Sequence, residues 1–251
     1  MPQRHVIKMS LSWRICNGSR ELIEGAADFI LSCAEQSIAR HQRFQIVLAG
    51  GQTPAPVYRR LCQAKTDWSA WHVYFSDERC VAADDPGRNS HMARESLFSH
   101  VPVPAIQIHV IETSGGIEQS VTRYGDLVRR VTPFDLVLLG VGEDGHTASL
   151  FPGEAFDLDA WCVAVHGAPK PPTERISLGL RALRATEQVL VMASGYGKQK
   201  AVDDWQRGLS TPINAVTAGL RGLVLLDRTV VTSLPNDAGQ AKGGERSGED
   251  A

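Results

Sequence analysis

The sequence predicts a three-layer α/β/α fold built on a mostly parallel, Rossmann-like sheet. Short apolar runs recur along the chain, and stretches with the 3.6-residue periodicity of amphipathic helices lie between several of them. This alternation favours a parallel sheet covered by helices on both faces, because strands buried on both faces are almost continuously apolar. The expected strands are 44–49, 72–76, 106–111, 134–139, 161–166, 188–193 and 222–226.

Two helices are expected from an apolar face, and a third is expected from its first turn. In the segment LAGGQTPAPVYRRL (48–61), Thr53 is expected to act as the N-cap, and Pro54 suits the first helical position. The two apolar faces comprise Leu22, Ala26, Phe29, Ile30, Cys33 and Ile38 in one helix, and Val121, Tyr124, Leu127 and Val128 in the other.

The composition is that of an ordinary globular protein of 251 residues, 43% hydrophobic and 22% charged. No linker divides the chain, so we expect a single domain over residues 1–235. The tail 236–251 is rich in glycine and charge and poor in large apolar groups, and we expect it to be disordered. The formal net charge of −2 gives no reason to expect nucleic acid or a membrane surface as a partner.

The cysteines indicate a cytoplasmic protein with reduced thiols. The chain has 5 of them, widely spaced and without a C-x-x-C pair, so neither a disulfide framework nor a zinc site is indicated. The N-terminal segment lacks the apolar core of a signal peptide, and no apolar run is long enough for a membrane span.

Four candidate ligand-binding loops follow predicted strands. Their sequences are AGGQTP, SDER, GVGEDGHTAS and SGYGK, and each contains glycine or ionisable groups. Because open α/β sheets bind ligands beyond the carboxyl ends of their strands, we expect these loops to converge on one site.

The third loop contains a G-x-G-x-x-G pattern, Gly140-x-Gly142-x-x-Gly145, which is typical of dinucleotide-binding turns. Such a turn opens a long helix, but Pro152 follows closely here. The next strand also ends without the carboxylate that would hold a ribose. The pattern therefore does not indicate a nicotinamide site.

The remaining loop residues suit catalysis or anion binding, although each also has a purely structural interpretation. His146 lies on a glycine turn and has a side chain suited to general-base catalysis near neutral pH. Asp77 and Arg79 would point to the same side of an extended segment, where they could hold a hydroxylated substrate. Arg175, together with either Lys198 or Lys200, suits a phosphate group. A solvated loop or an unliganded helix start would account for any one of these groups alone.

The set of motifs resembles the 6-phosphogluconolactonases, relatives of the glucosamine-6-phosphate deaminases and isomerases. The resemblance covers roughly residues 20–230. It rests on the segments LAGGQTPAPVYRRL, WHVYFSDERCVAADDPGRNSHMARESLF, FDLVLLGVGEDGHTASLFPG, RISLGL and ASGYGK, which occur in this order.

The resemblance implies the fold of the glucosamine-6-phosphate deaminases and hydrolysis of 6-phospho-D-glucono-1,5-lactone to 6-phospho-D-gluconate. This is the second step of the oxidative pentose phosphate pathway. It implies no metal and no organic cofactor, a small sugar-phosphate lactone as the partner, and a monomer or small homo-oligomer. By position in the motifs, His146 would activate water, while Asp77 and Arg79 would orient the sugar and stabilise charge. The substrate-binding residues would be Gly50, Gly51, Thr53, Asn89, Gly145, Arg175 and Lys198.

Three positions depart from the usual pattern of the family. Gln52 replaces the serine of a GGSTP loop, and Arg88 precedes Asn89 where the family usually has Ser-Asn. Asp227 begins an Asp-Arg-Thr-Val segment in place of the usual D-x-A-A. These departures concern the phosphate and sugar contacts more than His146.

Two other functions are alternatives to the lactonase. The deaminase relatives carry a glutamate five residues after the histidine, where this chain has Phe151, so the carboxylate that assists their ring opening is absent. A non-catalytic sugar-phosphate-binding protein is the second alternative. The regulator form of this alternative would need a DNA-binding segment, and the residues before the first helix are too few for a helix-turn-helix.

Overall fold

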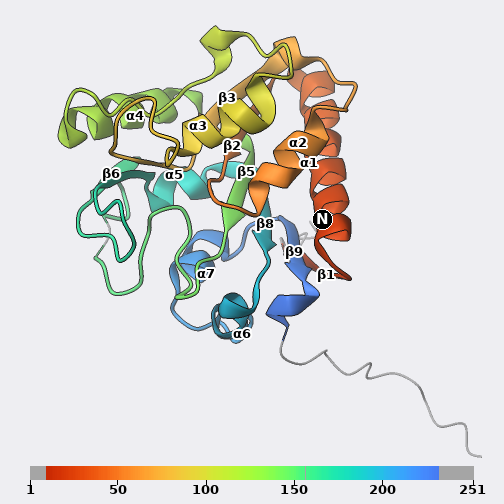
Figure 1. Cartoon of the computed structure of the whole chain (residues 1–251), viewed down its shortest axis with the longest axis vertical. Coiled ribbons are helices and arrows are strands. Elements are labelled where there is room, and N and C mark those ends of the chain that lie inside the picture. The colour runs from red at the N-terminus through yellow and green to blue at the C-terminus, as the bar shows by residue number, and fades with distance from the viewer. Residues whose placement is uncertain (1–9, 156, 232–251) are drawn as a thin grey trace, which may run out of the picture.

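The computed structural model describes residues 10–155 and 157–231 of the chain (Figure 1). Within these ranges a central sheet lies between helices, which confirms the predicted three-layer α/β/α fold. The tail 236–251 lies outside the described residues, and the single domain over 1–235 stays a prediction. No helix in the described ranges is both long and apolar enough to cross a membrane.

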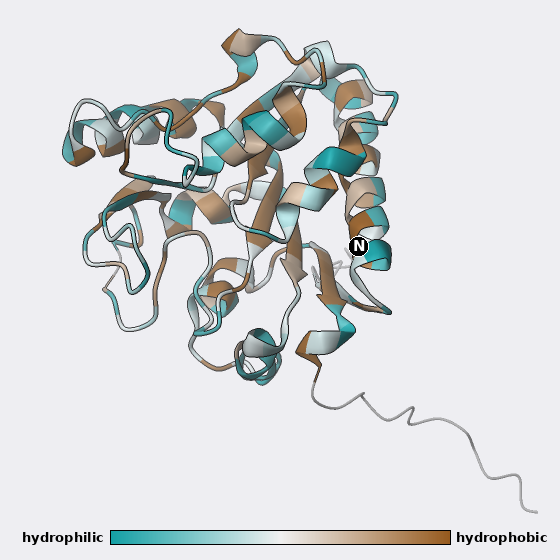
Figure 2. Cartoon of the chain, in the orientation of Figure 1, coloured by the Kyte–Doolittle hydropathy of each residue, from teal (hydrophilic) through white to brown (hydrophobic). Residues whose placement is uncertain are grey.

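The central sheet has six strands, all paired in parallel, in the order β1-β9-β8-β5-β2-β3. Its middle strands are buried, and Figure 2 shows them in the hydrophobic colour, as expected for strands covered on both faces. The strands are β1 (Leu11–Cys16), β2 (Phe44–Leu48), β3 (Trp71–Phe75), β5 (Phe134–Gly140), β8 (Thr186–Ala193) and β9 (Gly222–Asp227).

A second, antiparallel sheet of three strands lies beside the first, in the order β4-β7-β6. Its strands are β4 (Asp77–Arg79), β6 (Cys162–Val165) and β7 (Arg175–Leu178). The predicted strand 161–166 therefore exists, but it belongs to this small sheet. The SDER segment, expected to be a loop, forms β4 and pairs with β7.

The predicted strand 106–111 is wrong. The chain forms a short 3-10 helix at Ala105–Gln107, and a single bridge from Ile108 to Val73 follows it. The alternating pattern of this segment resembled a strand, but Ile106 is 86% exposed, so its apolar side chains do not share a buried face.

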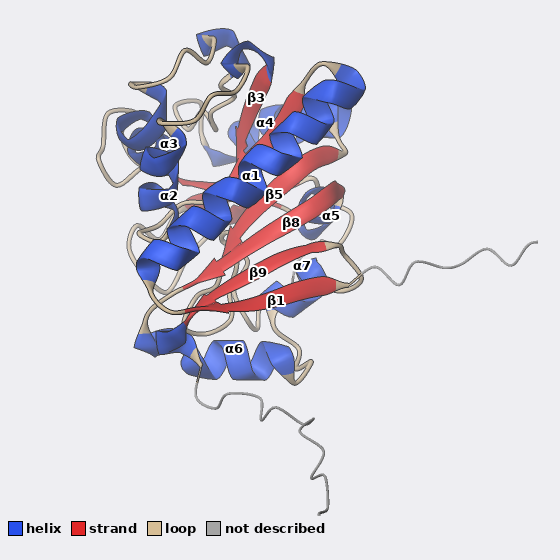
Figure 3. Ribbon diagram, turned by 90° about the vertical axis from the view of Figure 1, so that its right-hand side faces the viewer, coloured by secondary structure: helices blue, strands red, loops and turns tan. Residues whose placement is uncertain are grey.

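The helices form two layers around the central sheet. Figure 3 shows α1 crossing one face, with α4, α5 and α7 on the opposite face. The predicted apolar faces of α1 and α4 are buried or packed against the core. The helices are α1 (Ser19–His41), α2 (Pro54–Leu61), α3 (Asn89–Ala93), α4 (Ile117–Val131), α5 (Leu180–Arg184), α6 (Gln199–Gln206) and α7 (Pro212–Thr217).

The strand order creates a switch point between β2 and β5, which are neighbours in the sheet. The chain continues from β2 to β3 on one side, whereas it continues from β5 to β8 and β9 on the other. Connections that diverge in this way leave a crevice beyond the carboxyl ends of the two strands, where open α/β sheets bind ligands. The glycine loop after β2 and the His146 loop after β5 both begin there.

The outer edge of β3 is covered by a side chain and by a segment of chain. The buried hydroxyl of Tyr124 in α4 accepts a hydrogen bond from the Phe75 amide at 2.8 Å and lies 3.2 Å from the Phe75 carbonyl. The His109 amide donates to the Val73 carbonyl at 2.8 Å. These bonds satisfy polar groups that an edge strand would otherwise leave unpaired.

We expect Tyr124→Phe to lower the free energy of unfolding by about 1–3 kcal/mol, because it leaves the buried Phe75 amide unpaired. Tyr196→Phe is the matched control, since Tyr196 is 74% exposed. Urea unfolding followed by circular dichroism measures both variants. Equal stability of the two variants would contradict the role assigned to the Tyr124 hydroxyl.

Candidate active site

A cavity of about 560 Å³ lies at the switch point, and residues from all four predicted loops line it. The convergence predicted from the sequence is therefore confirmed for these loops. Of the predicted site residues, those that line the cavity are Gly50, Gly51, Thr53, Asp77, Arg79, Asn89, His146, Arg175 and Lys198. Gly145 does not line it and instead forms part of the turn that carries His146.

The segment after β5 forms a tight turn and not the helix of a dinucleotide-binding motif. The Gly142 amide donates to the His146 carbonyl at 2.8 Å, and the Gly145 amide donates to the Gly142 carbonyl at 3.1 Å. A Cβ atom on Gly142 would lie 2.0 Å from Nδ1 of His146. Glycine is therefore required at position 142 for the imidazole to take its place above the turn.

Asp144 holds the imidazole of His146. Its Oδ1 lies 2.5 Å from Nδ1 of His146 and accepts the His146 amide at 3.0 Å. Burial raises the pKa of the Asp144 carboxyl, but the His146 amide and imidazole outweigh this effect and lower it. An ionised Asp144 favours the tautomer with the proton on Nδ1, which leaves Nε2 with the lone pair of a base. In the sequence Asp144 was recognised only as part of a turn.

The ring of Phe151 contacts both the imidazole of His146 and the guanidinium of Arg175. The ring of Phe151 lies 4.6 Å from the imidazole of His146, and the guanidinium carbon of Arg175 lies 5.6 Å from the same ring. Phe151 is buried and packs with Val165 and Ala168. This wall of the cavity is therefore apolar, with a titratable group and a permanent charge at its margins.

The carboxylate of Asp77 is held by three side chains. Oδ1 accepts hydrogen bonds from the Ser76 hydroxyl and from Nδ2 of Asn89, each at 3.0 Å, and Oδ2 accepts the Ser149 hydroxyl at 2.7 Å. Asp77 is 5% exposed. These bonds compensate the burial of the charge and join β4, α3 and the His146 segment.

Arg79 and Arg175 are directly opposite each other in the pairing of β4 with β7. The segment Asp77–Arg79 is extended, as predicted. Burial first, and then the charge of Arg79, lower the pKa of Arg175, while Asp77 opposes them. Nε of Arg79 is buried and has no hydrogen-bond partner within the described residues. Like charges directly opposite each other are destabilising, so this pair favours an anion in the cavity.

Part of the Arg175 guanidinium is already engaged by backbone. Nε donates to the Pro172 carbonyl at 3.1 Å and Nη2 to the Lys170 carbonyl at 2.7 Å. These bonds fix the plane of the guanidinium at the cavity wall. They also bring the segment that carries Lys170 to the cavity, where Lys170 itself is a lining residue.

Lys198 ends the short 3-10 helix Tyr196–Lys198 after β8 and lines the cavity. Burial lowers its pKa, the carboxylate of Glu143 raises it, and the ammonium of Lys170 lowers it. Glu143 and Lys170 form an exposed ion pair at 3.0 Å. Lys200, by contrast, pairs with Asp204 in α6 and does not line the cavity, so Lys198 is the cation that reaches it from this turn.

The glycine loop after β2 approaches the cavity closely, although one prediction about it is wrong. Thr53 has helical backbone angles and makes no side-chain capping hydrogen bond, so it does not act as the expected N-cap. Pro54 does begin α2, as predicted. A Cβ atom on Gly50 would lie 2.0 Å from Oδ1 of Asn89, so the absence of a side chain at position 50 allows Asn89 to fit between the loop and β4.

Comparison with known proteins places these features in one family. Residues 17–224 match the family model described as glucosamine-6-phosphate isomerases/6-phosphogluconolactonase. The 6-phosphogluconolactonase of Mycobacterium leprae is 32% identical over 247 residues, which are 90% of this chain and 100% of that protein. The 6-phosphogluconolactonase of Thermotoga maritima is 35% identical over 182 residues, which are 70% of this chain and 83% of that protein.

Solved structures show the same similarity in three dimensions. The crystal structure of the Thermotoga maritima 6-phosphogluconolactonase matches with a TM-score of 0.82 and 28% identity, covering 87% of this chain and 100% of that one. The 6-phosphogluconolactonase of Trypanosoma brucei matches with a TM-score of 0.80 and 25% identity, covering 88% and 98%. A monomeric glucosamine-6-phosphate deaminase shares the fold, with a TM-score of 0.78 and 21% identity, covering 88% and 98%.

The ammonium of Lys198 is expected to titrate below the reference value of 10.5, because burial disfavours its charged form. Glu143→Gln is expected to lower this pKa further, since it removes the carboxylate that supports the charge. NMR titration of the Lys198 side chain in the two proteins measures both effects. A pKa at or above the reference value, or an upward shift in Glu143→Gln, would show that this electrostatic assignment is wrong.

Proposed function

The chain belongs to the family of glucosamine-6-phosphate isomerases and 6-phosphogluconolactonases, within which it is a 6-phosphogluconolactonase, and we propose that His146 is its general base. The reaction is hydrolysis of 6-phospho-D-glucono-1,5-lactone to 6-phospho-D-gluconate in the oxidative pentose phosphate pathway. The observation that carries the proposal is the His146–Asp144 pair at the cavity, 2.5 Å between Nδ1 and Oδ1, beside a cluster of cations.

Nε2 of His146 takes a proton from a water molecule as the water oxygen attacks the lactone carbonyl carbon. A δ-lactone is an activated ester, so this step needs no covalent nucleophile. The carbonyl oxygen becomes an oxyanion in the tetrahedral intermediate. When the intermediate collapses, the bond to the ring oxygen breaks, and the imidazolium returns its proton to that oxygen. Asp144 favours the charged imidazole during both transfers.

Asp77 and Arg79 orient the sugar and stabilise the developing charge in this proposal. The guanidinium of Arg79 lines the cavity, where it can donate to an oxygen of the substrate. Its buried Nε has no hydrogen-bond partner in the described parts of the chain. The oxygens of Asp77 already accept three side-chain hydrogen bonds, so Asp77 contributes mainly by keeping Asn89 and Ser149 in place.

The phosphate group binds Arg175 and Lys198, together with Gly50, Gly51 and Thr53 of the loop after β2. The like charges of Arg79 and Arg175, which Asp77 partly offsets, support an anion at this end of the cavity. Asn89 bridges the glycine loop and β4, where it can also reach a hydroxyl of the sugar. The isomerase or deaminase chemistry is disfavoured because Phe151, which packs against His146, takes the position at which the deaminases carry a glutamate.

A cytoplasmic location and a monomer or small homo-oligomer remain part of the proposal. The proposal also includes no nucleic-acid partner, no membrane partner and no cofactor. The 5 cysteines are all free thiols in the structure, which agrees with a reducing compartment.

The parent protein is expected to accelerate hydrolysis of freshly generated 6-phosphogluconolactone, and His146→Ala to lose about 10²–10⁴-fold in kcat. The loss is expected because the substitution removes Nε2, the proposed proton acceptor. A coupled assay for 6-phosphogluconate, corrected for spontaneous hydrolysis, measures the rate, and circular dichroism checks the fold. His100→Ala is the control, since His100 is exposed and lies outside the cavity lining. Parental turnover by His146→Ala would refute the mechanism, and no turnover by the parent would favour a non-catalytic relative.

Lys198→Ala and Arg175→Ala are each expected to lower kcat/KM for the phosphorylated lactone by roughly tenfold to a hundredfold, the usual range for a hydrogen bond to a charged group. Unphosphorylated gluconolactone is expected to be affected much less. Steady-state kinetics on both lactones measure the difference, with Lys200→Ala as the matched control outside the cavity lining. Equal losses on the two lactones would show that these cations do not bind phosphate.

A further inference from the structure

Arg88 is the residue that replaces the usual serine before Asn89, and the proposed function gives it no role. We propose that Arg88 is a positioning residue for substrate binding, which acts through Glu78 on Asn89 and Arg79. This inference rests on the lactonase function, because the effect of Arg88 is expressed in the binding of the lactone.

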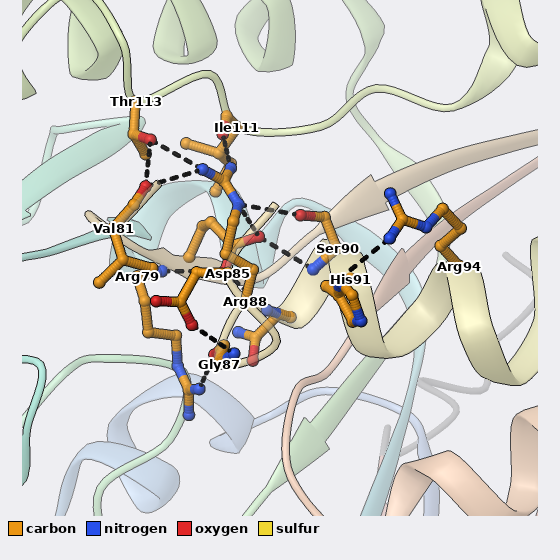
Figure 4. A network of polar contacts seen from close by, with 12 residues as sticks. Arg79, Val81, Asp85, Gly87, Arg88, Ser90, His91, Arg94, Ile111 and Thr113 are labelled. Carbon is orange, nitrogen blue, oxygen red and sulfur yellow. Dashed lines mark hydrogen bonds and ion pairs between the residues drawn. The ribbon is translucent and has the colours of Figure 1, made fainter. Parts of the chain in front are cut away.

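Arg88 is buried, 4% exposed, and its guanidinium holds three segments together (Figure 4). Nε donates to the Ser90 hydroxyl at 3.2 Å, Nη1 to the Thr113 hydroxyl at 2.8 Å, and Nη2 to the Ile111 carbonyl at 2.7 Å. Nη1 also lies 3.4 Å from the Val81 carbonyl. Each nitrogen of the guanidinium is therefore used inside the protein, so Arg88 does not bind the substrate itself.

Arg88 also supplies the positive charge beside Glu78, which is 0% exposed. Its Nε lies 3.4 Å from Oε2 of Glu78. A buried carboxylate without a cation is strongly destabilising, because the charge has lost its hydration. A serine at position 88 has one hydroxyl and no charge, so it could provide neither the counter-charge nor the fork of donors.

The carboxylate of Glu78 holds the backbone of the residues that line the cavity. Oε1 accepts the amides of Arg79 at 2.9 Å and Asn89 at 2.7 Å, and Oε2 accepts the Ser90 amide at 2.9 Å. Glu78 thus joins the end of β4 to the start of α3. The ion pair with Arg88 holds this carboxylate in place.

The side chains of Asn89 and Arg79 extend from this fixed backbone to the cavity. Nδ2 of Asn89 donates to the carbonyl and to the carboxylate of Asp77, at 2.9 and 3.0 Å. The guanidinium of Arg79 donates to the carbonyl of Gly87, the residue before Arg88. A shift of the backbone at position 88 therefore moves both the Asn89 amide and the Arg79 guanidinium relative to the sugar.

A purely structural role would have a different consequence. If Arg88 contributed only to stability, its replacement would lower the melting temperature, and the molecules that stay folded would bind substrate normally. A positioning role predicts a change in KM with little change in kcat, since His146 and Asp144 lie on a different loop.

The experiment compares kcat and KM for 6-phosphogluconolactone in the parent, Arg88→Met, Arg88→Lys and the double variant Arg88→Met/Glu78→Gln. The double variant removes the buried charge that the single Met substitution leaves uncompensated. Arg94→Met is the matched control, because Arg94 lies at the end of α3 in an exposed ion pair with Glu95. Thermal unfolding of each protein sets the assay temperature below its transition.

Arg88→Met is expected to raise KM about tenfold with kcat within about threefold of the parent. Arg88→Lys keeps the positive charge but lacks the several N–H donors of the guanidinium. Its KM is expected to lie between the values of the parent and of Arg88→Met. Arg94→Met is expected to match the parent.

A parental KM in folded Arg88→Met overturns the proposal, as does an effect confined to kcat. If Arg88→Met does not fold, the double variant and Arg88→Lys test the proposal in its place. A parental KM in either of these two variants overturns the proposal. Absence of turnover in both the parent and Arg94→Met would instead overturn the lactonase function, and with it this role for Arg88.

Discussion

The geometry of the cavity depends on the buried carboxylate of Asp77. Its donors Ser76, Asn89 and Ser149 come from three segments that meet only in the folded chain. A buried charge strongly favours the arrangement in which all its bonds are made, because any lost donor leaves the carboxylate partly unsolvated. Since Ser149 follows His146 by only three residues, the same carboxylate constrains the position of the proposed base relative to the residues that we propose hold the sugar.

Positive charge in the cavity is the second constraint, and the protein alone does not balance it. Asp144 is engaged with His146, and Glu143 is paired with Lys170. The opposed guanidinium groups of Arg79 and Arg175 therefore repel each other across two short strands. This arrangement costs stability in the free protein, and a phosphate bound as we propose would relieve it, as is usual where a site is organised for its ligand and not for the free chain.

The sequence was sufficient to predict the main strands and the loops that form the site, because continuous apolar runs such as 134–139 specify a buried strand by themselves. Strand β1 was missed because residues 12–14 are exposed on an edge strand. The predicted strand 106–111 failed for the related reason that its apolar residues have no common partner. The candidate site residues were predicted through the family motifs, whereas the partners of Arg88 were not. Two of these partners, the Ile111 carbonyl and the Thr113 hydroxyl, lie more than twenty positions away, and a sequence pattern carries no signal for them.

Phe151 explains why the same turn serves hydrolysis here and not isomerisation. A carboxylate at this position would lie against the imidazole of His146 and beneath the guanidinium of Arg175, the places that the phenyl ring now contacts. It would neutralise Arg175 and compete with Asp144 for the imidazole, which would weaken both the anion site and the orientation of the base. An aromatic ring adds no counter-charge to Arg175 and does not compete with Asp144 for the imidazole. It also covers one side of the imidazole of His146. Hydrolysis of a lactone needs one proton acceptor, and the phenyl ring at position 151 is compatible with the proposed role of His146 as that acceptor.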